Sequence, residues 1–133
     1  MILFYNPLST SPGKQPLPLS ILSLAAVVNG REAWTLVDGN LDGNPAATIV
    51  ERFRRDDGRT GPLLLAVSVM PGPQVSQAVP VCAAVRAALP QVHIVWGGYF
   101  PTQHTATVMK ASCVDSVVRS QGEQPLLQLL EAL

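Results

Sequence analysis

The residues best suited to admit a ligand are Gly97 and Gly98, which follow an apolar run typical of a buried strand. Consecutive glycines leave the backbone without side chains, so a bulky ligand can approach it closely, although a tight turn would require the same residues. Ser68 lies near the end of another apolar run and carries a hydroxyl that can donate or accept a hydrogen bond. These residue types predict a binding site and supply no general acid or base.

The histidines and cysteines of this chain do not indicate a catalytic or metal-binding site. His93 lies inside an apolar strand pattern and is better explained as a hydrogen-bonded strand residue than as a ligand. His104 opens a predicted helix, where a solvent-facing position is expected. Cys82 and Cys113 sit in apolar patterns that predict reduced, buried thiols. The sequence contains no Ser-His-Asp spacing, no paired carboxylates and no zinc spacing.

Bulk composition indicates a globular chain rather than a nucleic-acid or membrane binder. The 133 residues are 47% hydrophobic and 14% charged, with a formal net charge of zero, which predicts a single domain over residues 1–133 without a basic face. The first apolar run meets Asn6 and Pro7 too early for a signal peptide, and no apolar run is long enough for a membrane span. We therefore expect a cytoplasmic location, with neither nucleic acid nor membrane as partner.

The elements that position Ser68 and the glycines alternate strictly between strand and helix. This alternation predicts an α/β fold, a flavodoxin-like (Rossmann-like) doubly wound parallel sheet of five strands in the order 2-1-3-4-5, with helices on both faces. Ligands of such sheets bind at the carboxyl ends of the strands. The strands are expected at residues 2–5, 33–37, 63–69, 92–96 and 114–118, the helices at 19–28, 45–55, 74–89, 102–111 and 123–133, and an exposed turn at 56–59.

Several ligands common in this fold lack their sequence signatures here. There is no Gly-x-Gly-x-x-Gly after the first strand and no P-loop. A phosphorylated receiver domain would need acidic residues after the first strand, where Asn6 stands, and a late lysine, whereas Lys110 falls within a predicted helix. A flavin stays possible because Ser9, Thr10 and Ser11 follow the first strand, although that loop is rich in proline.

The spacing of the ligand-admitting residues resembles that of cobalamin-binding domains. Ser68-x-Met70 is followed by 26 residues and then by Gly97–Gly98, similar to the Ser-x-Leu and Gly-Gly elements of that family. Met70 replaces the usual leucine. The resemblance implies that the Ser68 hydroxyl meets the nucleotide tail of cobalamin, and that the paired glycines make room for this tail beside the sheet.

Further segments are similar to the cobalamin-binding domains of radical S-adenosylmethionine enzymes. They cover residues 6–7, 17–26, 37–40, 97–102, 114–119 and 122–123, and so extend over nearly the whole chain. The resemblance implies three groups of binding residues: Pro18, Leu19 and Ser20 beneath the corrin ring, Asp38 and Asn40 on its amide arms, and Tyr99, Phe100 and Thr102 along the tail or the corrin edge.

Two departures from related enzymes qualify the resemblance. The Asp-x-His-x-x-Gly element that provides a lower histidine ligand to cobalt is absent, and residues 6–18 contain no histidine. The Cys-x-x-x-Cys-x-x-Cys triplet of a [4Fe-4S] cluster is absent as well. The resemblance thus implies the N-terminal cobalamin-binding module of a larger methyltransferase- or cyclase-type radical enzyme, with S-adenosylmethionine and the cluster held outside this chain. The alternatives are a ligand-free flavodoxin-like interaction or regulatory domain and, less favoured, a flavin-binding domain.

Overall fold

The strands of the computed structural model, which describes residues 1–56 and 61–133, form a parallel sheet in the order β2-β1-β3-β4-β5. This confirms the predicted flavodoxin-like topology. The turn predicted at 56–59 lies, apart from Asp56, outside the described residues. The strands are β1 Ile2–Asn6, β2 Trp34–Asp38, β3 Leu64–Ser68, β4 His93–Gly97 and β5 Ser116–Val117.

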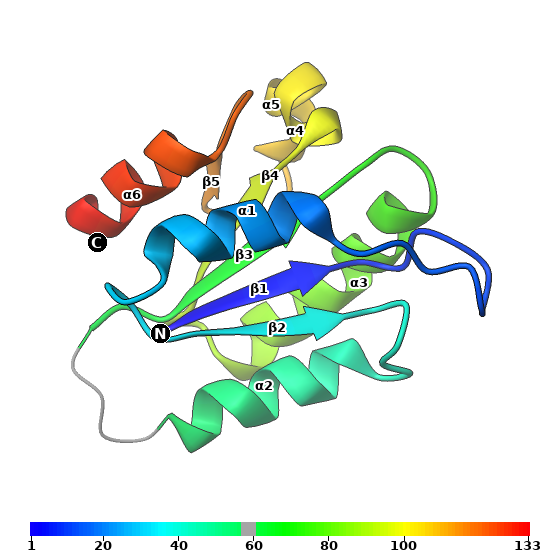
Figure 1. Cartoon of the computed structure of the whole chain (residues 1–133), viewed down its shortest axis with the longest axis horizontal. Coiled ribbons are helices and arrows are strands. Elements are labelled where there is room, and N and C mark those ends of the chain that lie inside the picture. The colour runs from blue at the N-terminus through cyan, green and yellow to red at the C-terminus, as the bar shows by residue number, and fades with distance from the viewer. Residues whose placement is uncertain (57–60) are drawn as a thin grey trace.

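Helices cover both faces of this sheet (Figure 1). Side chains alternate between the faces along each strand, so Ile2 and Phe4 pack against α1 and α6, whereas Leu3 and Tyr5 pack in a second core with α2 and α3. The helices are α1 Leu19–Val28, α2 Pro45–Arg55, α3 Pro73–Ala88, α4 Tyr99–Gln103, α5 Thr105–Val108 and α6 Glu123–Ala132.

The helices α1 and α2 have the predicted bounds, for local reasons. The Asn44 side chain accepts a hydrogen bond from the Ala47 amide at 3.4 Å, and Pro45 occupies the first turn, where its missing N–H costs nothing. The inner side of α1 is buried through Ile21 and Ala25, while its outer side stays exposed. None of the described helices is long and apolar enough to cross a membrane.

The helix predicted at residues 102–111 has the wrong bounds and is not continuous. The chain forms two short helices there, α4 and α5, and the first begins earlier than predicted, at Tyr99, where Gly98 turns the backbone at a φ of 100°. Pro101 is tolerated in the first turn of α4, and a break at His104 separates the two helices. Lys110 consequently lies in a turn after α5 rather than in a helix. The last strand is also shorter than predicted.

Candidate functional site

A channel opens beside the sheet where β3 and β4 end. Ser68 and Gly97 pair directly across these two parallel strands, on the face covered by α1 and α6. The channel has a volume of about 210 Å³. It is lined by Phe4, Ser20, Ile21, Ser23, Leu24, Ala66, Val67, Ser68, Val95, Gly97, Gly98, Val118, Ser120, Gln121, Gly122, Glu123 and Leu126.

Buried and exposed lining residues of this channel differ in polarity. Every buried lining residue is apolar, whereas the polar side chains are all exposed or half-buried. The channel thus has an apolar floor and a polar rim, an arrangement common in small-molecule sites. The buried residues are Phe4, Ile21, Ala66, Val67, Val95 and Leu126, and the polar ones are Ser20, Ser23, Ser68, Ser120, Gln121 and Glu123.

Gly98 is required by the backbone conformation after β4, whereas Gly97 is not. A Cβ on Gly98 would approach the Val69 carbonyl oxygen to 3.0 Å, and its φ of 100° is unfavourable for other residues, so the backbone turn itself requires glycine. A Cβ on Gly97 would meet only Val118, at an ordinary 3.8 Å. Gly97 is therefore not needed by the fold, and its missing side chain leaves the channel open.

Ser20 and Ser68 face each other at the rim of the channel. Their hydroxyl oxygens lie 3.4 Å apart, joining the first turn of α1 to the end of β3. Both groups are accessible and form a weak, long hydrogen bond, so each can exchange it for a bond to a ligand. Two residues expected to bind the tail or the corrin are thereby brought together.

The loop between β5 and α6 closes the far side of the channel. Its Ser120 has a φ of 61°, and its amide donates a hydrogen bond to the Thr102 hydroxyl at 3.0 Å. A Cβ on Gly122 would come within 3.0 Å of the Leu24 side chain of α1. Thr102, which was expected to border a ligand, supports the channel wall from outside and does not line the channel.

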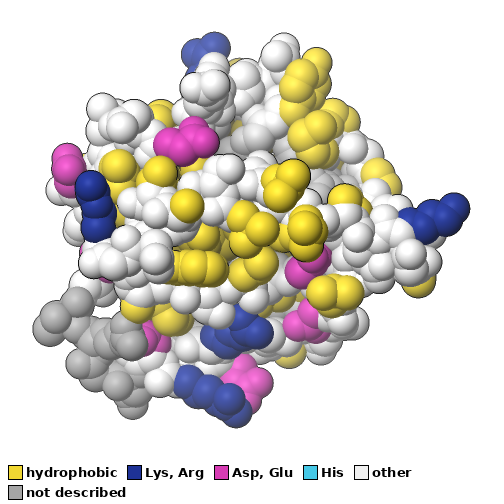
Figure 2. Space-filling model, in the orientation of Figure 1, with side chains coloured by type: hydrophobic (Ala, Val, Ile, Leu, Met, Phe, Trp, Pro, Cys, Tyr) yellow, Lys and Arg dark blue, Asp and Glu magenta, His cyan; other side chains and the backbone are white. Residues whose placement is uncertain are grey.

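Exposed apolar side chains surround the carboxyl edge of the sheet. Figure 2 shows hydrophobic side chains gathered across the face that carries α1. Among the described residues, ten large hydrophobic side chains are exposed. Five of them follow the carboxyl ends of β1 to β4, and we call this set the apolar collar: Leu17, Leu19, Leu41, Met70 and Tyr99. Pro18, between Leu17 and Leu19, lines a second and more open concavity together with Asp38 and Leu41.

Asp38 and Asn40 are occupied by hydrogen bonds within the protein. One Asp38 carboxylate oxygen accepts bonds from the Asn6 side chain at 3.1 Å and from the Asn40 amide at 2.9 Å. The Asn40 side-chain oxygen accepts from the Ser9 amide at 2.9 Å. Buried Gln74 adds a bond to the Pro7 carbonyl at 3.0 Å. These contacts hold the loop after β1, and the role expected for Asp38 and Asn40 on a ligand stays a prediction.

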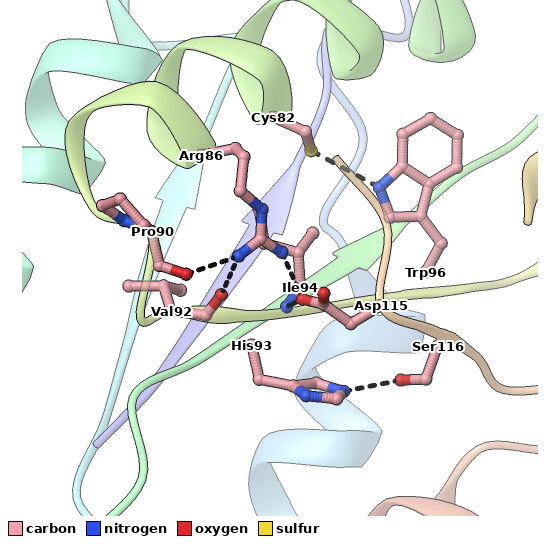
Figure 3. A network of polar contacts seen from close by, with 9 residues as sticks. All are labelled: Cys82, Arg86, Pro90, Val92, His93, Ile94, Trp96, Asp115 and Ser116. Carbon is pink, nitrogen blue, oxygen red and sulfur yellow. Dashed lines mark hydrogen bonds and ion pairs between the residues drawn. The ribbon is translucent and has the colours of Figure 1, made fainter. Parts of the chain in front are cut away.

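None of the histidines and cysteines lines the channel, and His93 and Cys82 belong to a separate network of polar contacts (Figure 3). His93 begins β4, at the amino edge of the sheet, and its Nε2 lies 2.8 Å from the Ser116 hydroxyl. Burial raises the pKa of the Cys82 thiol to about 12, which keeps it protonated. Arg86 pairs with Asp115 beside them. The described residues contain no cluster of three or more metal-ligating side chains.

The channel walls from the chain's second half escaped the sequence analysis. Gln121 and Leu126 line the channel but carry no motif, because their position depends on how α6 packs against α1. The available signals were the segments 114–119 and 122–123, which contain the lining residues Val118, Gly122 and Glu123, although no binding role was assigned to them. Of the predicted residues, Ser20, Ser68, Gly97 and Gly98 meet at one place, whereas Met70 and Tyr99 lie exposed at the edge and do not line the channel.

Comparison with known proteins gives one family and a likeness of fold to solved structures. The family described as B12 binding domain matches residues 6–130. A solved structure of the two-component response regulator RcsB-DNA complex aligns with a TM-score of 0.59 at 14% sequence identity, covering 99% of this chain and 59% of that one. At this identity the likeness concerns the fold alone. No curated protein matches the chain.

Proposed function

This chain belongs to the B12-binding domain family, and from that premise we propose that its channel holds the nucleotide tail of a cobalamin while the apolar collar faces the corrin ring. The channel is the observation that carries the proposal. It is open, has an apolar floor, and lies at the carboxyl edge of a doubly wound sheet, where ligands of this fold bind. An apolar cavity of about 150 Å³ holds one benzene molecule, so about 210 Å³ suits a larger aromatic ring.

The residues that would hold the tail are those at the rim and at the end of β4. The Ser68 and Ser20 hydroxyls offer hydrogen bonds to the sugar or phosphate of the tail. Gly97 and Gly98 leave the backbone accessible beside them. Leu19, Met70 and Tyr99 provide exposed apolar surface for the broad face of the corrin, and Pro18 fixes the chain at the start of α1.

We further propose that no protein histidine binds the cobalt. The loop from Pro7 to Pro18 contains no histidine. His93 lies at the opposite edge of the sheet, and the His104 ring packs against Phe100 with the ring centroids 4.9 Å apart. Bound cobalamin supplies a cobalt that can carry and release an alkyl group. In this arrangement the chain binds and orients the cofactor and leaves the lower face of cobalt without an imidazole from the protein.

The larger context that we propose is a B12-dependent radical S-adenosylmethionine enzyme of methyltransferase or cyclase type, in which this chain is the cofactor module. The segments quoted from the sequence support this assignment, and the channel has no catalytic acid or base among its buried lining residues. S-adenosylmethionine and a [4Fe-4S] cluster would belong to a catalytic part in the same polypeptide or in a partner subunit. A cysteine triplet found in that part supports the assignment, and its absence argues against it.

The binding proposal is tested by gel filtration of the purified protein with hydroxocobalamin. We expect corrin absorbance to co-elute with the protein in about equimolar amount, and the thermal unfolding temperature to rise with cobalamin concentration because the ligand binds the folded state. Elution of the two components apart would refute the proposal. In the Co(II) form, splitting of the EPR signal by a coordinated nitrogen would contradict binding without histidine, provided that a ¹⁵N-histidine label changes that splitting.

A further inference from the structure

The chemistry of the channel floor limits which lower base a corrinoid can place there. The floor is formed by Phe4, Ala66 and Val95 from the sheet and by Ile21 and Leu126 from the two covering helices, all buried. None of these side chains carries a hydrogen-bond donor or acceptor. The backbone groups of the strands are already paired within the sheet.

Corrinoids differ in the base at the end of the nucleotide tail. A dimethylbenzimidazole presents an apolar ring with two methyl groups, whereas an adenine presents an exocyclic amine and several ring nitrogens. Burying such polar groups without hydrogen-bond partners is unfavourable, and sites without partners reject them. Sugar and phosphate groups are shared by both kinds of tail, and both could use the Ser20 and Ser68 hydroxyls at the rim.

We infer that this channel selects corrinoids by their lower base and takes benzimidazole-type bases in preference to purine-type bases. The inference rests on the proposed function, because it assigns the channel to the tail of the corrinoid. It adds a specificity determined by Phe4, Ala66, Val95 and Leu126, none of which carries a cofactor motif. The polar rim contributes to affinity for the tail and not to the choice of base.

Equilibrium dialysis of the purified protein against three corrinoids tests the inference. The probes are hydroxocobalamin, the corresponding adeninyl cobamide, and cobinamide, which lacks the base. We expect the adeninyl form to bind at least about tenfold more weakly than cobalamin, a difference of about 1.4 kcal/mol, and cobinamide to bind more weakly than cobalamin too. Equal affinity for the two cobamides would overturn the inference and leave the proposed function intact. Failure of all three corrinoids to bind would overturn both.

A matched pair of variants locates the selectivity in the floor. Val95→Thr keeps the side-chain shape and places a hydroxyl in the channel, so the preference for cobalamin over the adeninyl form should shrink several-fold. Val85→Thr makes the same change in the other core, on the buried side of α3. We expect it to reduce stability but to leave the preference unchanged. An unchanged preference in a folded Val95→Thr protein, or an equal loss in both variants, would contradict the inference.

Discussion

A Cβ placed on Gly97 would lie 3.8 Å from the Cβ of Val118, at ordinary contact distance. The two residues come from β4 and from the segment after β5, and both line the channel. The protein therefore has room for a small side chain at position 97, and a larger one would extend into the channel. Substitution there can block a ligand with little cost to the fold.

Gly97→Val should reduce cobalamin retention by at least about tenfold, a loss of about 1.4 kcal/mol of binding, while the unfolding temperature changes little. The valine side chain would occupy the space that the tail requires. Titration followed by corrin absorbance measures the first quantity, and circular dichroism measures the second. Ala84→Val, a similar enlargement on the exposed side of α3, should leave binding unchanged. If Gly97→Val bound cobalamin with normal affinity, the nucleotide tail would not occupy the channel beside Gly97.

Ser68→Leu should abolish measurable co-elution of cobalamin, because a leucine at the rim would fill the entrance beside Ser20. The milder Ser68→Ala removes one hydroxyl and should weaken binding by about 0.5–1.5 kcal/mol, the usual net contribution of a hydrogen bond. Isothermal titration calorimetry distinguishes these two effects. Ser76→Leu on the exposed side of α3 serves as the control and should bind normally. Equal affinities of Ser68→Ala and the unmodified protein would remove the hydroxyl from the binding site.

Gly98→Ala should destabilise the fold by about 1–3 kcal/mol in urea unfolding. The residue has a φ of 100° and a ψ of −169°, a conformation largely restricted to glycine. The new Cβ would also press on the Val69 carbonyl oxygen. Gly43→Ala is the matched control, since no atom lies within 4 Å of a Cβ there. A stability loss in Gly98→Ala no larger than in this control would contradict the assigned strain.

Stability should fall as pH rises above about 9. Burial raises the pKa of the Cys82 thiol from 9.0 to about 12. Between these values the unfolded chain loses a proton that the folded chain keeps, so the free energy of unfolding decreases by up to about 1.4 kcal/mol per pH unit for this group. Urea unfolding at pH 8 and pH 10.5 measures the fall. Cys82→Ala should be less stable at pH 8 but should show a shallower fall, and an identical slope would exclude this thiol as a cause.

Much of the fold follows from local sequence. The Asn44–Pro45 pair and the Asn29–Gly30 pair mark ends of α2 and α1 through capping preferences, and the apolar run at Leu64–Ser68 marks a strand buried on both faces. The split between α4 and α5 was not predictable in this way. The break falls at His104. The early start of α4 follows from the positive φ of Gly98, and Gly97 and Phe100 on either side of it hydrogen-bond to Val69, just after β3.

The candidate site likewise contains some residues that the sequence predicts and others that depend on tertiary packing. Ser68 and Gly97 could be predicted because each ends a recognisable strand and parallel strands share their carboxyl edge. The hydrogen bond between Asn6 and Asp38 could not, since β1 and β2 must pair before these two side chains meet. Val118 and Leu126 were missed because an apolar wall residue looks like any core residue until the helices are packed.

The helices α1 and α6 meet along one face although nearly a hundred residues separate them in the sequence. Leu126 of α6 lines the channel together with Ile21 of α1, so this wall is complete only when the last segment of this region has been synthesised and packed. Because a domain generally folds as a unit, we expect a ligand of the channel to bind only after α6 has packed against α1.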